Sequence, residues 1–231
     1  MSSTKSARRQ TSGTSAAPAA RSTTAMLACG IVAGPLFVVT VLAQALTRAG
    51  FDPKRHPLSS LSLGELGWIQ ITNFVVTGLL VLAFAVAIRR VLHPGRAGTW
   101  GPLLIGVNGL SLIAGGLFLA DPVGGYPPGM PEQATWHGIV HSTAPSLAGL
   151  AGLAAYAVFA RRFASAGQRG WATLCLAFAP AVLALNIAAA IAADFRLMLA
   201  GLALGWAWTS LIALRLMAET RSSATIHSPR T

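Results

Sequence analysis

The sequence is short of charged residues and of cysteine. Only 10% of its 231 residues are Asp, Glu, Lys or Arg, whereas a soluble globular domain carries about 25%. The chain therefore lacks the charged shell that a water-soluble protein of this length would need. Its two cysteines, Cys29 and Cys175, are too few for a disulfide framework, and we expect each to be a small buried side chain.

The net charge of +11 would point to a nucleic-acid partner in a soluble protein. Here its distribution argues against that partner, because the basic residues stand in short connectors between apolar runs. No basic stripe interleaved with aromatic residues occurs anywhere in the chain. We therefore expect no nucleic acid to bind and interpret the basic residues as a signal of membrane topology.

Apolar residues are what the chain has in abundance: they make up 54% of it, and its mean hydropathy is positive. They form six runs, each near the ~20 residues that cross a ~30 Å hydrocarbon core. The runs are Ala25–Leu46, Trp68–Ile88, Trp100–Ala120, His137–Ala160, Trp171–Ala193 and Phe195–Met217. The sequence predicts an all-α fold, a polytopic bundle of six transmembrane helices over residues 25–217, surrounded by the lipid bilayer. Only Asp194 separates the last two runs, which predicts a tight hairpin.

The segments that flank the apolar runs are polar. Residues 1–24 are rich in Ser, Thr and Ala without periodicity, which predicts a disordered cytoplasmic tail. Residues 218–231 are polar and basic and are predicted to form a second cytoplasmic tail. An alternative for the first run is a signal peptide cleaved after Ala43-Gln44-Ala45, but the apolar stretch exceeds the usual 7–15 residues of such a peptide.

The distribution of Lys and Arg predicts the orientation in the membrane. Of the 17 basic residues, 13 fall in the two ends and in the connectors after the second and fourth runs. The opposite side has only Arg48, Lys54, Arg55 and Arg196. By the positive-inside rule, both termini lie in the cytoplasm. We therefore predict a multi-pass protein of the cell membrane with its N-terminus and C-terminus in the cytoplasm.

Two extracytoplasmic segments, residues 51–68 and 121–141, stand out from the apolar background. They contain polar and ionisable side chains at or near outer helix ends, where a shared pocket can form. The candidate pocket residues are Asp52, Ser60, Asp121, Tyr126, His137 and His141. We predict a polar pocket at the extracytoplasmic face that binds or transports a lipid or small amphiphile.

The two segments resemble the domain of unknown function 998 family of bacterial membrane proteins. The matching residues in the first are Asp52, Ser60, Leu61, Gly64, Gly67, Trp68 and Asn73. In the second they are Asp121, Pro122, Gly125, Pro127, Pro128, Gly129, His137, Gly138 and His141. The resemblance spans nearly the whole membrane region. It implies a multi-helix membrane protein and supplies no activity.

The pair His137 and His141 suggests an alternative, a metal-dependent membrane lipid hydrolase. Residues four apart share one face of a helix, and this is the spacing at which two histidines hold zinc in zincins. A third ligand would come from Asp121 or His56, with metal-bound water as the nucleophile. The pattern is similar to the alkaline ceramidase and progestin-receptor superfamily, where the pair lies in the last helix rather than the fourth. Zinc or another divalent metal is the implied cofactor.

Structural explanations compete with these functional ones. The histidines can hydrogen-bond at the membrane interface beside Trp136, which would act as an aromatic anchor. Three intramembrane amides, Asn73, Asn108 and Asn186, are expected to form interhelical hydrogen bonds worth about 0.6 kcal/mol each. Small residues of the fourth and sixth runs, Ala148, Gly149, Gly152, Gly201 and Gly205, predict close helix packing. A pure scaffold function stays open, and the sequence does not predict the oligomeric state.

Overall fold

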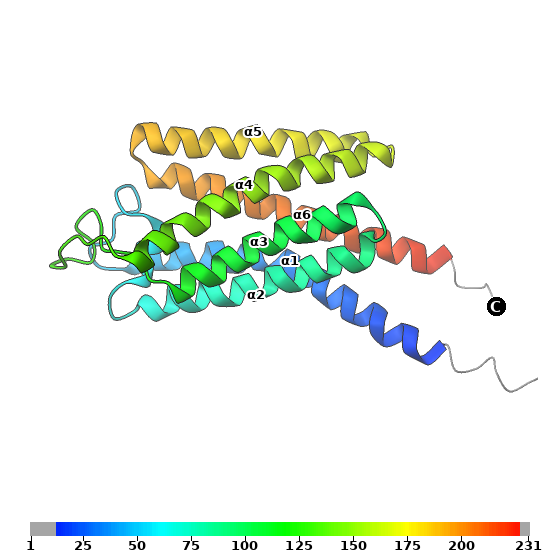
Figure 1. Ribbon diagram of the computed structural model, residues 1–231, viewed down its shortest axis with the longest axis horizontal. Helices are drawn as coiled ribbons and strands as arrows, with labels where there is room; N and C mark the ends of the chain where they lie inside the picture. The colour runs from blue at the N-terminus through cyan, green and yellow to red at the C-terminus, as the bar shows by residue number, and fades with distance from the viewer. Residues whose placement is uncertain (1–12, 227–231) are drawn as a thin grey trace, which may run out of the picture.

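The computed structural model describes residues 13–226, and these form six long helices and one short 3-10 helix (Figure 1). All six long helices are long and apolar enough to cross a membrane, which confirms the predicted all-α bundle. The helices are α1 (Gly13–Thr47), α2 (Gly67–Leu92), α3 (Arg96–Leu117), α4 (Trp136–Ser165), α5 (Arg169–Ala192) and α6 (Phe195–Ile226), and the 3-10 helix is η1 (Leu58–Ser62). The described residues contain no strand, only a single bridge between Val123 and Tyr126.

Two helices extend beyond the predicted membrane region. α1 begins at Gly13, inside the segment predicted to be a disordered tail, and α6 continues to Ile226. Once a membrane span has formed its first turns, each further residue adds one backbone hydrogen bond at small entropic cost, so polar flanking residues can continue the helix. Residues 1–12 and 227–231, the remainder of the two predicted tails, lie outside the described residues.

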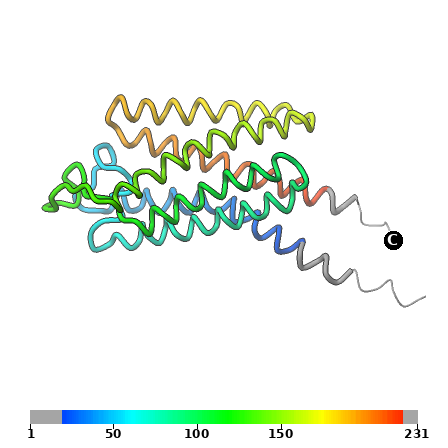
Figure 2. The backbone as a smooth tube through the Cα atoms, viewed as in Figure 1, coloured from blue at the N-terminus to red at the C-terminus, as the bar shows by residue number. Residues whose placement is uncertain are grey.

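The helices are arranged as a closed ring. Each helix packs against the next one in the chain, and α6 returns to pack against α1. Other pairs have little contact, except that side chains of α4 and α6 meet through an aromatic cluster and an ion pair. Figure 2 shows the chain running back and forth along the long axis of the bundle. A ring of six helices leaves an interior that side chains from all of them face.

The two ends of the ring differ. Residues 48–66, 118–135 and 193–194 connect helices at one end, named here the loop end, and the start of α1 and the end of α6 lie at the other, named here the tail end (Figure 1). The predicted tight hairpin between the last two helices is confirmed. It turns at Ala193, which has a left-handed backbone with a φ of 48°, and the Asp194 amide donates to the Ala189 carbonyl at 3.1 Å.

A buried polar ladder joins α1 to α2. The Gln44 side chain donates to Gln70 Oε1 at 2.8 Å, and Asn73 Nδ2 donates across the interface to the Phe37 carbonyl at 3.3 Å. Thr77 extends the ladder by donating to Asn73 Oδ1 at 3.3 Å. The prediction of interhelical bonding is therefore confirmed for Asn73. Both cysteines are free, and Cys175 is buried as predicted, whereas Cys29 is half-buried.

Candidate functional site

His56 holds the two long loops of the loop end together. Its Nδ1 accepts a hydrogen bond from the Asp52 amide at 2.9 Å, so the other ring nitrogen, Nε2, carries the proton and donates to the Gly124 carbonyl at 3.1 Å. The ring is buried and contacts the rings of Phe51 and Tyr126, with centroids 5.5 and 5.3 Å away. Both nitrogens of His56 are therefore occupied by backbone groups.

Arg48, the residue directly after α1, holds the loop of residues 48–66 against the helices. Its guanidinium donates to the carbonyls of Leu61, Leu63 and Leu66 and, at 3.0 Å, to Gln44 Oε1. The carbonyls of a loop packed on a helix bundle need such donors, because a buried backbone oxygen without a partner is costly. This basic residue of the loop end thus serves the local backbone.

Asp121 organises the start of α4. Its carboxylate accepts hydrogen bonds from the Thr135 amide at 2.8 Å and the Thr135 hydroxyl at 2.6 Å. Thr135 in turn caps α4 by accepting from the Gly138 amide at 3.2 Å. These two bonds from Thr135, with a smaller contribution from His137 and His141, hold the pKa of Asp121 below its usual range. A Cβ added at Gly138 would overlap the Asp121 carboxylate, so glycine is required there.

The two histidines of α4 face different surroundings. His137 Nδ1 lies 2.9 Å from the Thr135 hydroxyl, at the half-buried start of the helix. His141 is one turn further on and is buried, with only 4% of its surface exposed. Its Nδ1 lies 2.7 Å from the Phe118 carbonyl oxygen, so this nitrogen carries the proton and donates. The ring also stands edge-on to Phe74.

The described residues contain no group of three or more His, Cys, Asp or Glu side chains placed to hold a metal ion. Both nitrogens of His56 and both carboxylate oxygens of Asp121 already have hydrogen-bond partners. A catalytic zinc site needs three protein ligands and an open position. The arrangement in residues 13–226 therefore does not fit a preformed site built on His137, His141 and Asp121.

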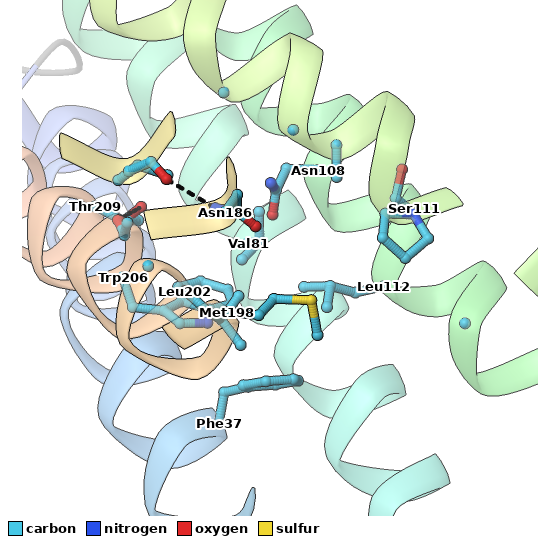
Figure 3. A pocket seen from close by; sticks show the side chains of 18 of the residues that line it. Phe37, Val81, Asn108, Ser111, Leu112, Asn186, Met198, Leu202, Trp206 and Thr209 are labelled. Carbon is cyan, nitrogen blue, oxygen red and sulfur yellow. Dashed lines mark hydrogen bonds between the residues drawn. The ribbon is translucent and has the colours of Figure 1, made fainter. Parts of the chain in front are cut away.

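The ring of helices encloses a cavity of about 320 Å³, within the range of known small-molecule sites. All six helices and η1 contribute to its wall, which is largely aliphatic and aromatic (Figure 3). His141 is the one residue of the predicted pocket that lines it, and Ser59, next to Ser60, lies at the same end. The cavity therefore begins next to the loops of the loop end and extends from there along the helices.

Missing side chains create much of this space. A Cβ added at Gly149 or Gly152 of α4 would meet no atom within 4 Å, and both glycines line the cavity. The prediction of close helix packing is wrong at these two residues, because the space beside each is open. Further along, α4 does contact α6, with the ring centroids of Tyr156 and Trp208 4.6 Å apart. The prediction holds at Gly201 of α6, where an added Cβ would lie 3.0 Å from the Asn186 side chain.

The cavity reaches the surface of the bundle between α4 and α5. Of its lining residues, only Pro145, Gly149 and Asn186 are exposed. Pro145 and Gly149 belong to α4 and Asn186 to α5. The opening therefore faces sideways, toward the surroundings of the helices rather than along the bundle axis.

Several polar groups on the cavity wall lack partners among the described residues. The Trp206 indole nitrogen is buried without a hydrogen bond, although the neighbouring Trp208 indole donates to Cys175 Sγ at 3.3 Å. Asn186 Nδ2 donates to the carbonyl of Val182, in its own helix, at 2.8 Å, leaving Oδ1 facing the cavity. No hydrogen bond to another described residue involves the Asn108 amide, which also lines the cavity (Figure 3).

The structure places the other predicted pocket residues outside the cavity wall. Asp52 and Tyr126 belong to the contacts around His56, and Asp121 and His137 to the start of α4. Ser60 is buried in η1, and its hydroxyl has no partner among the described residues. Sequence reasoning missed Asn108, Asn186 and Trp206 as site residues. Polar side chains are rare within membrane spans and often functional, and this rarity could have identified the two asparagines as candidates.

Comparison with known proteins returns one match. No curated protein and no solved structure matches the chain. A family described as a protein of unknown function, DUF998, matches residues 31–215. This match runs from the middle of α1 into α6 and covers most of the sequence, so the chain belongs to the DUF998 family.

Proposed function

We propose that this integral membrane protein binds a lipid or small amphiphile in the cavity enclosed by its six helices. The observation that carries the proposal is a set of unpaired polar groups, above all the buried Trp206 indole, on an otherwise apolar cavity wall. Leaving a buried polar group without a partner costs roughly 1–3 kcal/mol in proteins. A bound molecule with a polar group and an apolar body would satisfy these side chains and fill the space.

The sideways opening supports a membrane-borne ligand. Between α4 and α5, the opening at Pro145, Gly149 and Asn186 faces the region that the bilayer occupies around a transmembrane bundle. Pro145 is nine residues beyond the start of α4 at the loop end, about 14 Å along a helix of 1.5 Å rise per residue. A lipid in the leaflet at the loop end can therefore reach the cavity without crossing water.

The basic residues favour an orientation in which the loop end faces away from the cytoplasm of the cell. Arg89 and Arg90 end α2, and Arg169 begins α5, all at the tail end. By the positive-inside rule, the tail end with both termini is cytoplasmic, and the ligand enters from the outer leaflet of the cell membrane. Reporter fusions after Arg90 and Arg169 should report the cytoplasm and one after Gly125 the outside. An outside signal at Arg169 would contradict this orientation.

Filling the cavity tests the proposal. Gly152→Leu places a side chain in open space on the cavity wall, and leucine favours a helix over glycine by about 1 kcal/mol, so folding should not suffer. The matched control is Gly106→Leu, at a glycine of α3 that also has open space around it but lines a separate pocket between α2 and α3, outside this cavity.

The measurement is native mass spectrometry of the full chain released from gentle detergent. We expect lipid-sized adducts on the wild-type chain and on Gly106→Leu, and about tenfold fewer on Gly152→Leu, because one leucine occupies space that the ligand needs. Equal adducts on all three proteins, or none on the wild type after reconstitution with total membrane lipid, would contradict the proposal.

A further inference from the structure

We infer that the polar group of the ligand is uncharged and bears a hydroxyl, as in a monoacylglycerol, a diacylglycerol or a long-chain alcohol, and that Asn108 and Asn186 recognise it. This inference rests on the proposed function and names the class of ligand. Three observations carry it: the absence of charge from the cavity wall, the kind of hydrogen-bonding groups left unpaired there, and the sideways opening.

The cavity wall carries no carboxylate, ammonium or guanidinium group, and its one imidazole, His141, already uses Nδ1 on the Phe118 carbonyl. A charged headgroup moved into an apolar site loses its hydration, and only an opposite charge with good geometry can offset that loss. None of the basic side chains of the loop end lines the cavity, and Arg48 donates to three loop carbonyls and Gln44 instead. Phosphate, carboxylate and ammonium headgroups are therefore disfavoured inside the cavity.

The unpaired groups require both a donor and an acceptor from the ligand. Asn186 uses its Nδ2 on the Val182 carbonyl, so its free Oδ1 can only accept a hydrogen bond. The Trp206 indole, buried to 94% and without a partner among the described residues, can only donate. The Asn108 amide can do both. A hydroxyl, which donates one bond and accepts others, matches this set, and a ketone or ether alone does not.

The amides are placed where a lipid entering from the side would put its polar end. Asn186 is both a lining residue and one of the exposed residues of the opening. Asn108 comes from α3, across the cavity, and Figure 3 shows both amides on the cavity side of their helices, beside Val81. Beside them the wall consists of apolar side chains such as Phe37, Leu112 and Met198, which suits a hydrocarbon chain.

Titration of the full chain with four probes that share an 18-carbon chain tests the inference, with binding read by native mass spectrometry. The probes are monooleoylglycerol, oleate and oleylamine at neutral pH, and 1-octadecene as a chain without a polar group. We expect monooleoylglycerol to bind about tenfold tighter than either charged probe, because neither charge finds a partner in the cavity.

Asn108→Leu separates recognition from folding, because this amide has no partner to lose. We expect it to weaken monooleoylglycerol about fivefold, the loss of a hydrogen bond, and to leave 1-octadecene unchanged. Thr72→Val, on the exposed face of α2, should change neither probe. Equal binding of neutral and charged probes, or no effect of Asn108→Leu on monooleoylglycerol, would overturn the inference.

The two proposals fail in distinguishable ways. If Gly152→Leu blocks all four probes but charge and Asn108 make no difference, the cavity binds lipid and the inference about the polar group is wrong. If Gly152→Leu blocks none of them, the proposed function fails as well.

Discussion

The loop end and the cavity use polar residues in opposite ways. At the loop end, His56, Asp121 and Arg48 have all their principal partners within the protein, mostly backbone groups. In the cavity, Asn108, Asn186 and Trp206 retain hydrogen-bonding capacity that no described residue uses. Ionisable side chains in the loops therefore hold this structure together, whereas two neutral amides on the cavity wall keep hydrogen-bonding groups that no described residue uses.

This difference has a physical origin. A loop that folds over a helix bundle must provide partners for its own buried backbone groups, and histidine, aspartate and arginine supply them. Within a bilayer, an unpaired amide is tolerated only where it gains a partner or reaches water. Residues that look reactive in the sequence can thus be structural, and residues that look structural can line a site.

Two glycines of α4 offer the largest contrast. Gly138→Ala should destabilise the protein by roughly 2 kcal/mol or more, as for overpacked positions, because its Cβ would overlap the Asp121 carboxylate. Gly149→Ala, on the cavity wall, should be neutral or stabilise the protein by up to about 1 kcal/mol, since its Cβ meets no atom within 4 Å. Thermal unfolding in detergent measures both. Equal melting temperatures for the two variants would show that the loop end is not tightly packed.

His56→Phe tests the junction between the loops. Phenylalanine retains the ring contacts with Phe51 and Tyr126 but leaves the Asp52 amide and the Gly124 carbonyl without partners. Unpaired buried groups of this kind cost about 1–3 kcal/mol, and the melting temperature should fall accordingly. His93→Phe at the tail end, where the ring has no hydrogen bond with a described residue, is the control. If the melting temperature fell equally in both variants, the hydrogen bonds of His56 would not be what joins the two loops.

Asn73 and Asn108 should differ in their contribution to stability. Asn73→Leu removes the bond to the Phe37 carbonyl and should cost about 0.6–1.7 kcal/mol, the range for interhelical bonds in a bilayer. Asn108→Leu, which loses no bond to a described residue, should leave the unfolding temperature of the ligand-free protein unchanged or higher. Denaturation of both variants in lipid-free detergent measures this. A clear loss of stability in Asn108→Leu would mean that the amide has a structural partner.

Acidity should loosen the loop end by a small amount. Because the folded-state pKa of Asp121 lies below its ordinary value of 3.8, the ionised carboxylate contributes stability above that value. This contribution is lost as the pH falls below 3.8 through the lower folded-state pKa. The difference in melting temperature between wild type and Asp121→Asn should therefore shrink below pH 4. A difference that stays constant down to the lowest pH at which both proteins fold would contradict this role of Asp121.

The sequence predicted the helices well because the bilayer sets their length. An apolar run near 20 residues must be helical to satisfy its backbone in lipid, so six runs sufficed to predict six spans. The loop contacts were beyond reach, because His56 and Gly124 lie 68 residues apart and no local pattern specifies their pairing. The spacing of His137 and His141 was read correctly as one face of a helix, but what that face meets depends on Phe118 and Thr135.

The cavity was missed for a related reason. Its wall combines residues from six helices, and Gly149 and Gly152 form the same pattern in sequence whether they face a packed helix or an empty space. Asn73, Asn108 and Asn186 likewise look alike as isolated amides in apolar runs. Only their positions in the ring separate Asn73, which bonds α1 to α2, from the two that face the cavity.

Photo-crosslinking distinguishes a ligand that lies among the helices from one that lies at the loop end. A monoacylglycerol with a diazirine in its acyl chain is incubated with the full chain in lipid nanodiscs, and peptide mass spectrometry locates the adducts. We expect adducts on the apolar cavity wall, at Leu112, Met198 or Leu202, and their loss in Gly152→Leu. Adducts confined to residues 118–135 of the loop end, or to lipid-facing side chains such as Leu110 and Leu147, would contradict it.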